Sequence, residues 1–324
     1  MATSKDWAFP AELQPKAEEM DFDLGAALNS LVLLRAEVPE DAFTAGILGT
    51  ERIGNGVVIR DDGLVLTIGY LITEASAIWL TTNQGTVASA YPLAYDQATG
   101  FGLVQPLGRL GVPALRRGTA DACGVGDDVV VAGHGGRAHS LKARILAKRE
   151  FAGYWEYLLD EAIYTAPAHP QWGGAALISG DGRLLGIGSL LVQEEVGART
   201  VQGNMMVPID LLEPILADMV LLGRPDGPVR PWLGMYTTEV SGHLVVAGVA
   251  DGGPADSAGV QVGDVVLDIA GERVTELADF FRKLWQLGPA GTEVPISVSR
   301  DSKKLKLRLQ SADRQDFLKK PRLH

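Results

Sequence analysis

Residues 165–188 read TAPAHPQWGGAALISGDGRLLGIG and contain the pattern that decides the fold. Two short apolar runs, at 175–178 and 184–190, flank the sequence Gly180-Asp181-Gly182. A turn of the Asp-Gly type between two apolar runs predicts a tight β-hairpin. Trp172 stands just before the first run, beside two glycines. We therefore expect antiparallel β-structure that is entered through a glycine-rich loop.

Two earlier stretches have the same character. Residues 53–72 read IGNGVVIRDDGLVLTIGYLI, in which Asp61-Asp62-Gly63 joins two apolar runs, and residues 95–104 read YDQATGFGLV. Further short runs between turn signals predict strands at 31–34, 56–59, 64–67, 77–80, 129–132, 163–166 and 205–207. So many short strands predict a mostly β fold with a chymotrypsin-like pair of antiparallel barrels, the second beginning near Arg116.

The quoted stretches resemble the active-site segments of the HtrA/Deg serine proteases. That family has Gly-Asn-Ser-Gly-Gly-Pro-Leu in place of residues 170–176 and Leu-Thr-Asn-x-His-Val in place of 66–71. It has Asp-x-x-x-Asp-Leu-Ala-Val-Leu in place of 96–104. The separations between the matching positions, 30 and 72 residues, are also typical of the family. The resemblance implies a protease-like scaffold with its active site between the barrels.

The residues that the resemblance places at the catalytic triad cannot do its chemistry. Trp172 stands at the serine and has no hydroxyl oxygen to attack a carbonyl. Tyr70 stands at the histidine, and tyrosine titrates at about pH 10, too high for a general base at neutral pH. Gly100 stands at the histidine-orienting aspartate, although the family's first aspartate is present as Asp96. The sequence therefore predicts that all three members of a Ser-His-Asp triad are absent.

The oxyanion hole is degenerate in the same comparison. Pro170 stands where the family has a glycine, and proline has no N–H to donate to a developing oxyanion. The joint loss of four functional positions indicates a naturally inactive paralogue. We expect the Trp172 side chain to fill the vacated space; the alternative is a plug or an anchor for a partner.

The composition is that of a globular protein with a sizeable core. Of 324 residues, 46% are hydrophobic and 21% are charged, which suits two or three domains. The 39 glycines, many of them between short apolar runs, favour a mostly β chain. The formal net charge of −11 disfavours nucleic acid and anionic membrane surfaces as partners.

Several features bear on the compartment. Cys123 is the only cysteine, so an intramolecular disulfide is excluded, and we expect it to be a small buried apolar residue. The N-terminus has no charged region followed by an apolar one, and the apolar stretch at 24–34 is too short and interrupted to span a membrane. We expect a cytoplasmic protein or, if a leader was removed, a periplasmic one, as the resemblance implies.

The sequence predicts five parts along the chain. A helix with one apolar face is expected at 209–222 with Gly223 as its C-terminal stop, followed by a Pro/Gly-rich linker. The parts are an N-terminal arm (1–23), the double barrel (24–222), the linker (223–231), a PDZ domain (232–312) and a solvated C-terminal tail (313–324).

The N-terminal arm carries three isolated aromatic residues, Trp7, Phe9 and Phe22. The simplest interpretation is a disordered leader without a core of its own. In the HtrA family, N-terminal aromatics help to form a trimer, so the alternative is docking on a neighbouring subunit. Both interpretations stay open at this point.

Residues 232–312 resemble a PDZ domain of the HtrA type. The run GPADSAGVQVGDVVL at 253–267 is similar to the family's Gly-Ser-Pro-Ala-x-x-Ala-Gly-Leu-x-x-Gly-Asp-x-Ile, and Thr275 is expected to cap a helix over 276–286. PDZ domains bind chain termini by strand addition. The residues that the resemblance implies for peptide binding are the carboxylate-binding loop Trp232-Leu233-Gly234-Met235, Tyr236 on the edge strand, and Phe280, Phe281 and Leu284 along the groove.

Other candidate sites are weaker. Ser140, Ser179 and Ser189 are interpreted as ordinary polar residues rather than replacement nucleophiles, because neighbouring positions on a strand face opposite ways. His134 and His139 lie on a glycine-rich loop, but no neighbouring cysteine or third histidine supports a metal site. We therefore expect neither a metal nor a cofactor.

The leading hypothesis is a catalytically inactive HtrA-like pseudoprotease that binds C-terminal or extended peptides through its PDZ domain. Such a protein would regulate or scaffold relatives, in homo- or hetero-trimers, or hold unfolded substrates. The alternative is a serine endopeptidase with a rearranged active site. A third possibility is a small-molecule or metal-binding role in the old cleft.

Overall fold

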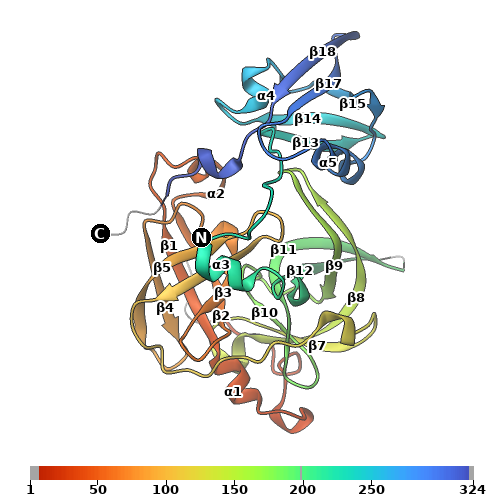
Figure 1. Ribbon diagram of the computed structural model, residues 1–324. Helices are drawn as coiled ribbons and strands as arrows, with labels where there is room; N and C mark the ends of the chain where they lie inside the picture. The colour runs from red at the N-terminus through yellow and green to blue at the C-terminus, as the bar shows by residue number, and fades with distance from the viewer. Residues whose placement is uncertain (1–6, 198, 321–324) are drawn as a thin grey trace. The chain divides into compact units, whose positions relative to one another are not determined.

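The computed structural model describes residues 7–197 and 199–320 and divides them into two compact units (Figure 1). The first unit contains residues up to 149, residues 161–226 and those from 319 onward. The second contains residues 150–160 and 227–318. The single domain boundary predicted near 223–231 therefore does not describe the whole division. Residues 150–160, the tip of a hairpin within the predicted double barrel, fold with the second unit.

Six antiparallel strands close the first barrel in the order β1-β2-β3-β6-β5-β4 (Figure 1). They are β1 (Leu31–Glu37), β2 (Glu51–Val58), β3 (Val65–Ile68), β4 (Ala77–Thr82), β5 (Val87–Tyr95) and β6 (Phe101–Pro106). Strand β4 alternates buried and half-buried side chains, as the two-residue period of a strand requires. Strand β5 escaped prediction because it is rich in alanine and contains Pro92, where its pairing with β6 shifts register.

The second barrel closes in the order β10-β11-β12-β9-β8-β7, and the predicted double-barrel architecture is thereby confirmed. Its strands are β7 (Asp128–Ala132), β8 (Ser140–Gly153), β9 (Tyr157–Ala166), β10 (Ala176–Ile178), β11 (Leu184–Val196) and β12 (Arg199–Pro208). Side chains from all six of these strands, including Val131, Ile145 and Leu177, form its buried core. The long hairpin of β8 and β9 carries the tip that folds with the second unit.

The helices of the first unit are short: α1 (Leu24–Asn29), α2 (Ala45–Leu48) and α3 (Leu216–Leu222). The helix predicted over 209–222 is wrong in its first half, where a 3-10 turn, η5 (Ile209–Leu211), precedes Pro214. Proline cannot donate an N–H inside a helix, so α3 begins only after it. Gly223 ends α3 with a φ of +76°, as predicted, but Leu222 on the predicted apolar face is 60% exposed. The other 3-10 turns of this unit are η1 (Ala17–Glu19), η2 (Gly69–Leu71), η3 (Ala120–Ala122) and η4 (Gly136–His139).

The N-terminal arm packs on its own chain, so the interpretation as a disordered leader is wrong for residues 7–23. The Trp7 ring lies 4.5 Å from the His139 ring and the Phe9 ring lies 5.2 Å from the His169 ring, centre to centre. The backbone N–H of Phe9 donates to Ala138 O at 2.9 Å. Residues 1–6 lie outside the described part of the chain.

The second unit has the fold expected for a PDZ domain. Its sheet runs β13-β14-β15-β17-β18, with β16 paired to β15. The elements are β13 (Met235–Val240), β14 (His243–Val249), α4 (Pro254–Ser257), β15 (Val265–Ile269), β16 (Glu272–Arg273), α5 (Leu277–Gln286), β17 (Glu293–Arg300), β18 (Lys303–Gln310) and η6 (Arg314–Phe317). The predicted Thr275 cap is wrong: Glu276 is the N-cap of α5, and the first helical N–H is accepted instead by Glu239 Oε1 at 2.8 Å.

The C-terminal residues are not a solvated tail as far as the structure describes them. The Phe317 ring lies 4.8 Å from the Trp232 ring within the second unit. In the first unit, the backbone N–H of Lys319 donates to Glu74 Oε1 at 2.9 Å. Pro321 and Arg322 lie outside the described residues. Within the described ranges, the helices are too short or too polar to cross a membrane.

Candidate functional site

The structure brings the three predicted triad positions together, although they lie far apart in the sequence. Tyr70 is in η2, directly after β3, and Gly100 is in the turn between β5 and β6. The N–H of Gly69 donates to Gly100 O at 2.7 Å, so these two segments touch beside Tyr70. Trp172 lies in the loop before β10, and its neighbour Gly173 faces the Tyr70 hydroxyl. We call this set of three residues, Tyr70, Gly100 and Trp172, the interbarrel site.

The Tyr70 hydroxyl has a structural partner in the second barrel. It donates to Ser189 O at 2.9 Å, and so joins η2 of the first barrel to β11 of the second. Burial raises the pKa of the Tyr70 phenol above its ordinary value, and the smaller effect of the Trp172 side chain opposes this. The hydroxyl is therefore neutral over the physiological range and holds the barrels together instead of accepting a proton.

Asn55 on β2 fixes the loop that carries Trp172, a role that the sequence did not signal. Its side-chain amide donates to Gln171 O at 2.8 Å and to Gly173 O at 3.2 Å. Its Oδ1 accepts the N–H of His134 at 2.8 Å, and its side chain is buried. Gly174 must be glycine, because its φ is +74° and a Cβ would lie 1.9 Å from Asn55 O. The loop is thus held by one amide and by close backbone packing.

Two backbone positions of the loop, Pro170 and Gln171, have no free N–H to donate to an oxyanion. Pro170 contributes no N–H, as predicted, and the N–H of Gln171 donates to His169 Nδ1 at 3.1 Å. The other His169 ring nitrogen, Nε2, lies 3.0 Å from His139 O. The ring is therefore the tautomer with its hydrogen on Nε2. Burial lowers the pKa of His169 to about 4, so the ring is neutral at pH 7 and both its nitrogens are used in the structure.

Asp96 has a turn-forming role and does not compensate for Gly100. Its carboxylate accepts the N–H of Ala98 at 3.2 Å and the N–H of Thr99 at 2.8 Å. It also accepts the Thr99 hydroxyl at 2.7 Å. These bonds close the turn between β5 and β6.

The serines considered as replacement nucleophiles have local partners. Ser140 Oγ donates to Gly136 O at 2.9 Å. Ser179 Oγ donates to the Asp181 carboxylate within the Gly-Asp-Gly turn. Ser189 is buried, and its carbonyl accepts the Tyr70 hydroxyl. Ser140 and Ser179 therefore act as turn and strand residues.

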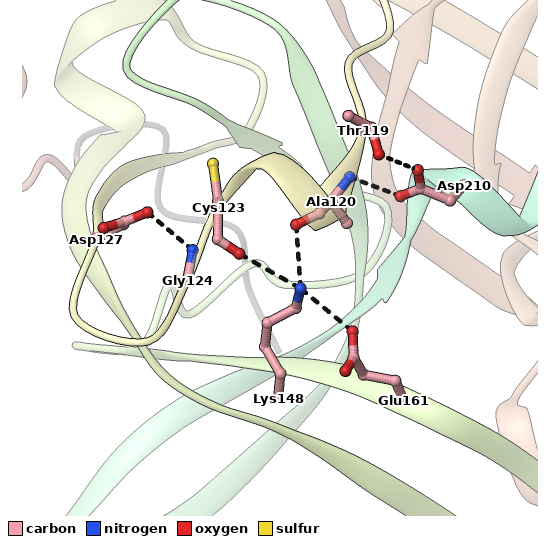
Figure 2. A network of polar contacts seen from close by, with 8 residues as sticks. All are labelled: Thr119, Ala120, Cys123, Gly124, Asp127, Lys148, Glu161 and Asp210. Carbon is pink, nitrogen blue, oxygen red and sulfur yellow. Dashed lines mark hydrogen bonds and ion pairs between the residues drawn. The ribbon is translucent and has the colours of Figure 1, made fainter.

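Cys123 is half-buried, not fully buried as predicted, and its surroundings oppose thiolate formation. Burial raises the pKa of its thiol, and the Asp127 and Asp181 carboxylates raise it further. Lys148 Nζ donates to Ala120 O at 3.1 Å and to Cys123 O at 3.3 Å, and pairs with Glu161 at 3.2 Å. Figure 2 shows that the Lys148 amine points toward these two carbonyl oxygens, whereas the Cys123 thiol points away from the amine. The network holds the loop before β7 and does not activate the sulfur.

His134 and His139 are the remaining candidates for a metal site. Burial lowers the pKa of each ring. His134 Nε2 and His139 Nδ1 are buried without a hydrogen-bond partner among the described residues. The third histidine nearby, His169, has its ring nitrogens occupied as described above. In the described part of the chain, no group of three or more His, Cys, Asp or Glu side chains is placed to hold a metal ion.

The second candidate site is the loop Trp232-Leu233-Gly234-Met235, which we call the carboxylate loop. The N–H groups of Leu233 and Met235 each donate to the carboxylate of Glu156, at 3.0–3.1 Å. Glu156 is in the hairpin tip between β8 and β9, which belongs to the same unit. Sequence patterns gave no sign of this partner, because 77 residues separate it from Leu233.

The predicted groove residues are more deeply buried than expected. Phe280, Phe281 and Leu284 of α5 are fully buried and belong to the core cluster of the second unit. Leu158, from the start of β9, is in the same cluster. Tyr236 lies on the edge strand β13, as predicted.

Comparison with known proteins agrees with this architecture. Residues 54–187 match the trypsin-like peptidase domain family, and residues 231–310 match the PDZ domain family. A "probable periplasmic serine endoprotease DegP-like" of Ectopseudomonas mendocina (strain ymp) is 27% identical over 278 residues, which are 80% of this chain and 56% of the relative. A protein of the same description from Halomonas elongata is 26% identical over 263 residues, 77% of this chain and 54% of the relative. This chain thus spans about half the length of the curated relatives that it matches.

Solved structures show the same fold. The HtrA-type protease AlgW with decapeptide superimposes with a TM-score of 0.54 at 19% identity, over 93% of this chain and all of that one. The serine endoprotease from Yersinia pestis superimposes with a TM-score of 0.52 at 20% identity, over 91% of this chain and 99% of that one.

Fold and domain order therefore define a trypsin-like double barrel followed by a PDZ domain. The two domain matches and the relatives support the HtrA family for this chain, and the structural neighbours have the same fold.

Proposed function

We propose that this protein is a catalytically inactive HtrA-family member that acts as a scaffold or regulator and binds peptide segments through its PDZ domain. The observation that carries the proposal is the interbarrel site. Tyr70, Gly100 and Trp172 occupy one place in the fold and offer neither a nucleophilic hydroxyl with an adjacent base nor an orienting carboxylate. The arrangement at Pro170 and Gln171 supports the same conclusion, because Pro170 has no N–H and the N–H of Gln171 is used by His169.

A second candidate function is favoured by the relatives, which are named serine endoproteases. In that case the chain would be an endopeptidase with a rearranged site. The nucleophile would have to be a serine that gains a base in a conformation different from the one described. Ser189 is the serine nearest to that role, because its backbone already contacts Tyr70.

Labelling with a fluorophosphonate probe, together with digestion of β-casein, separates the two candidates. We expect no labelled serine and no cleavage, with the E. mendocina relative as a positive control. The Trp172→Ser variant should be equally unlabelled, because a hydroxyl without a base is not activated. A probe adduct mapped to any serine of the wild-type chain would establish the endopeptidase.

The PDZ part of the proposal rests on the carboxylate loop, whose N–H groups converge on one carboxylate. It is also supported by the peptide-bound HtrA-type neighbour. We further propose a periplasmic location, because the relatives are named periplasmic, and assembly into homo- or hetero-trimers with HtrA-type proteins. Sedimentation velocity of the chain alone and mixed with the E. mendocina relative tests the assembly: a monomer in both samples would refute it.

A further inference from the structure

The carboxylate loop holds a carboxylate in the geometry of a bound chain terminus. Glu156 Oε1 accepts the N–H of Leu233 and of Met235, both at 3.1 Å, and Oε2 accepts the N–H of Leu233 at 3.0 Å. Gly234, between these donors, has a φ of +69°, a conformation that lets neighbouring N–H groups point into one hollow. The Glu156 side chain is buried there. A loop of this kind recognises a carboxylate by backbone donors alone.

The residues before Glu156 also bond to the domain as the residues before a peptide C-terminus would. Tyr154 O accepts the N–H of Thr237 at 3.2 Å. Tyr154 is two residues before Glu156, and Thr237 is two residues after Met235. The two segments therefore run antiparallel, as in strand addition to a sheet edge. The edge is β13, whose other side pairs with β14.

Side chains of the turn also contact the second unit. The Tyr154 ring lies 6.3 Å from the Tyr236 ring in an edge-to-face arrangement. Leu158 is buried with Phe280 and Phe281 of α5 in the core cluster. The tip thus presents a carboxylate, a backbone carbonyl, an aromatic ring and an apolar side chain to the domain.

The local backbone explains why a glutamate side chain is used. Glu156 has a φ of +59°, so the chain turns back into β9 at this residue. A segment inside a chain has no α-carboxylate, and only an acidic side chain can supply the group in its place. Arg282 pairs with Glu150 at 2.5 Å and with Asp160 at 2.6 Å at exposed positions, where such pairs contribute little, and the hairpin itself tethers the turn to the chain. A segment tethered in this way has a high effective concentration at the site.

We propose that the turn Tyr154-Trp155-Glu156 is an internal ligand that occupies the peptide site of the PDZ domain. The external partner is then a protein C-terminus with a free α-carboxylate and an aromatic residue two positions before it, which must displace the turn. This inference rests on the proposed peptide-binding function and names its ligand class. It also means that the wild-type chain binds such termini far more weakly than its loop allows.

The test uses the full chain and a fluorescein-labelled decapeptide, AKREFAGYWV, which is residues 147–155 followed by one valine with a free carboxylate. Fluorescence anisotropy gives its Kd for wild type, for Glu156→Gly and for Asp160→Ala. Glycine removes the internal carboxylate and keeps the positive φ without strain. Asp160→Ala removes the same charge from the same hairpin but leaves the loop occupied.

We expect Glu156→Gly to bind the peptide at least tenfold more tightly than wild type, and Asp160→Ala to bind it within twofold of wild type. The C-terminal amide of the peptide should bind to none of them. Hydrogen exchange without peptide supplies a second readout: the amides of Leu233 and Met235 should exchange at least tenfold faster in Glu156→Gly. Glu156→Asn, which also tolerates a positive φ but is too short to reach the loop, replaces Glu156→Gly if that variant does not fold.

Two results would contradict different parts of the proposal, the internal ligand and the C-terminal peptide as partner. Equal Kd values for wild type and Glu156→Gly, with equal exchange at Leu233 and Met235, refute the internal ligand and leave peptide binding in place. Faster exchange without peptide binding by any variant supports occupation by Glu156 and refutes the C-terminal peptide as the partner. The two failures are therefore distinguishable.

Discussion

The interbarrel site and the carboxylate loop are both places where a ligand of an HtrA-type protein would lie, and in this chain both are occupied by the chain's own residues. The two sites differ in whether the groups that would act on the ligand are still present. At the interbarrel site we propose that the reactive side chains are replaced: Tyr70 bonds Ser189 O, and Trp172 stands at the position matched to the nucleophile. At the carboxylate loop the binding groups are backbone N–H donors, and these are intact and engaged by Glu156.

The difference follows from which atoms do the work. Acyl transfer needs particular side chains, so a few substitutions remove it and no conformational change restores it. Carboxylate binding by a loop needs only N–H groups in a suitable backbone conformation, which any residues that permit that conformation supply. We therefore expect permanent loss at the first site and reversible occupation at the second.

Asn55→Ala is the most severe test of the first site. The substitution leaves Gln171 O and the N–H of His134 without their buried partner, whereas Gly173 O keeps the backbone N–H of residue 55. Unfolding in urea should show a loss of about 4 kcal/mol, because each unpaired buried group costs about 1–3 kcal/mol. Gln193→Ala, at an exposed position of β11, is the control. A loss below about 1 kcal/mol would mean that the loop does not depend on Asn55.

The protein should also lose stability in acid through His169, which accepts the N–H of Gln171 in the loop that carries Trp172. The folded-state pKa of His169, about 4, lies below the ordinary value of 6.5 because the ring is buried. The stability linked to this neutral ring is complete above pH 6.5 and is lost as the pH falls towards 4, by about 3 kcal/mol. The measurement is urea unfolding of wild type and His169→Gln between pH 7.5 and 4. The difference between their free energies of unfolding should become smaller as the pH falls, because only the wild type carries the titrating ring. His243→Gln, at an exposed position, should run parallel to wild type.

The second site should show the opposite pH dependence. Burial raises the pKa of Glu156 to about 7 from an ordinary 4.5, although the N–H groups of the loop and the charge of Arg314 oppose the rise. Tyr236 also faces this carboxyl. The stability linked to the protonated form is complete below about pH 4.5 and is lost as the pH rises to 7. The loss should reach only about 2 kcal/mol, because the tip can release instead.

The measurement for Glu156 is the difference in free energy of unfolding between wild type and Glu156→Gln, whose amide does not titrate. Wild type should lose stability relative to this variant between pH 4.5 and 7 and run parallel to it above pH 8. A difference that stays constant across this range would show that the carboxyl is exposed to water in solution.

Tyr70→Phe is the mildest test. It removes the hydrogen bond to Ser189 O and leaves the ring in place. The expected loss is about 1 kcal/mol in urea unfolding, the contribution of one hydrogen bond, with no change in casein digestion. Tyr91→Phe, at another half-buried tyrosine of the first barrel, is the matched control. A change in casein digestion would give Tyr70 a chemical role.

Much of the architecture was predictable because it depends on local patterns. Asp-Gly turns between apolar runs identified the hairpins, and the glycine at 223 identified the end of α3. Strand β8, in contrast, was missed because its charged and apolar residues do not alternate regularly along its length. Its far end also folds with the other unit. The aromatic residues of the arm could not be assigned a partner, because their contacts with His139 and His169 cross more than a hundred residues.

The sequence by itself determined which chemical groups are present. It established tyrosine, glycine and tryptophan at the three positions matched to the triad, proline at the oxyanion loop, and a glycine-containing loop ahead of a PDZ edge strand. Only the tertiary structure decided which groups meet: Asn55 with the Trp172 loop, His169 with Gln171, and Glu156 with Leu233 and Met235. The reason is that residue type fixes what a group can donate or accept. The partner of a buried polar group is fixed by folding, which brings distant segments together and excludes water from both.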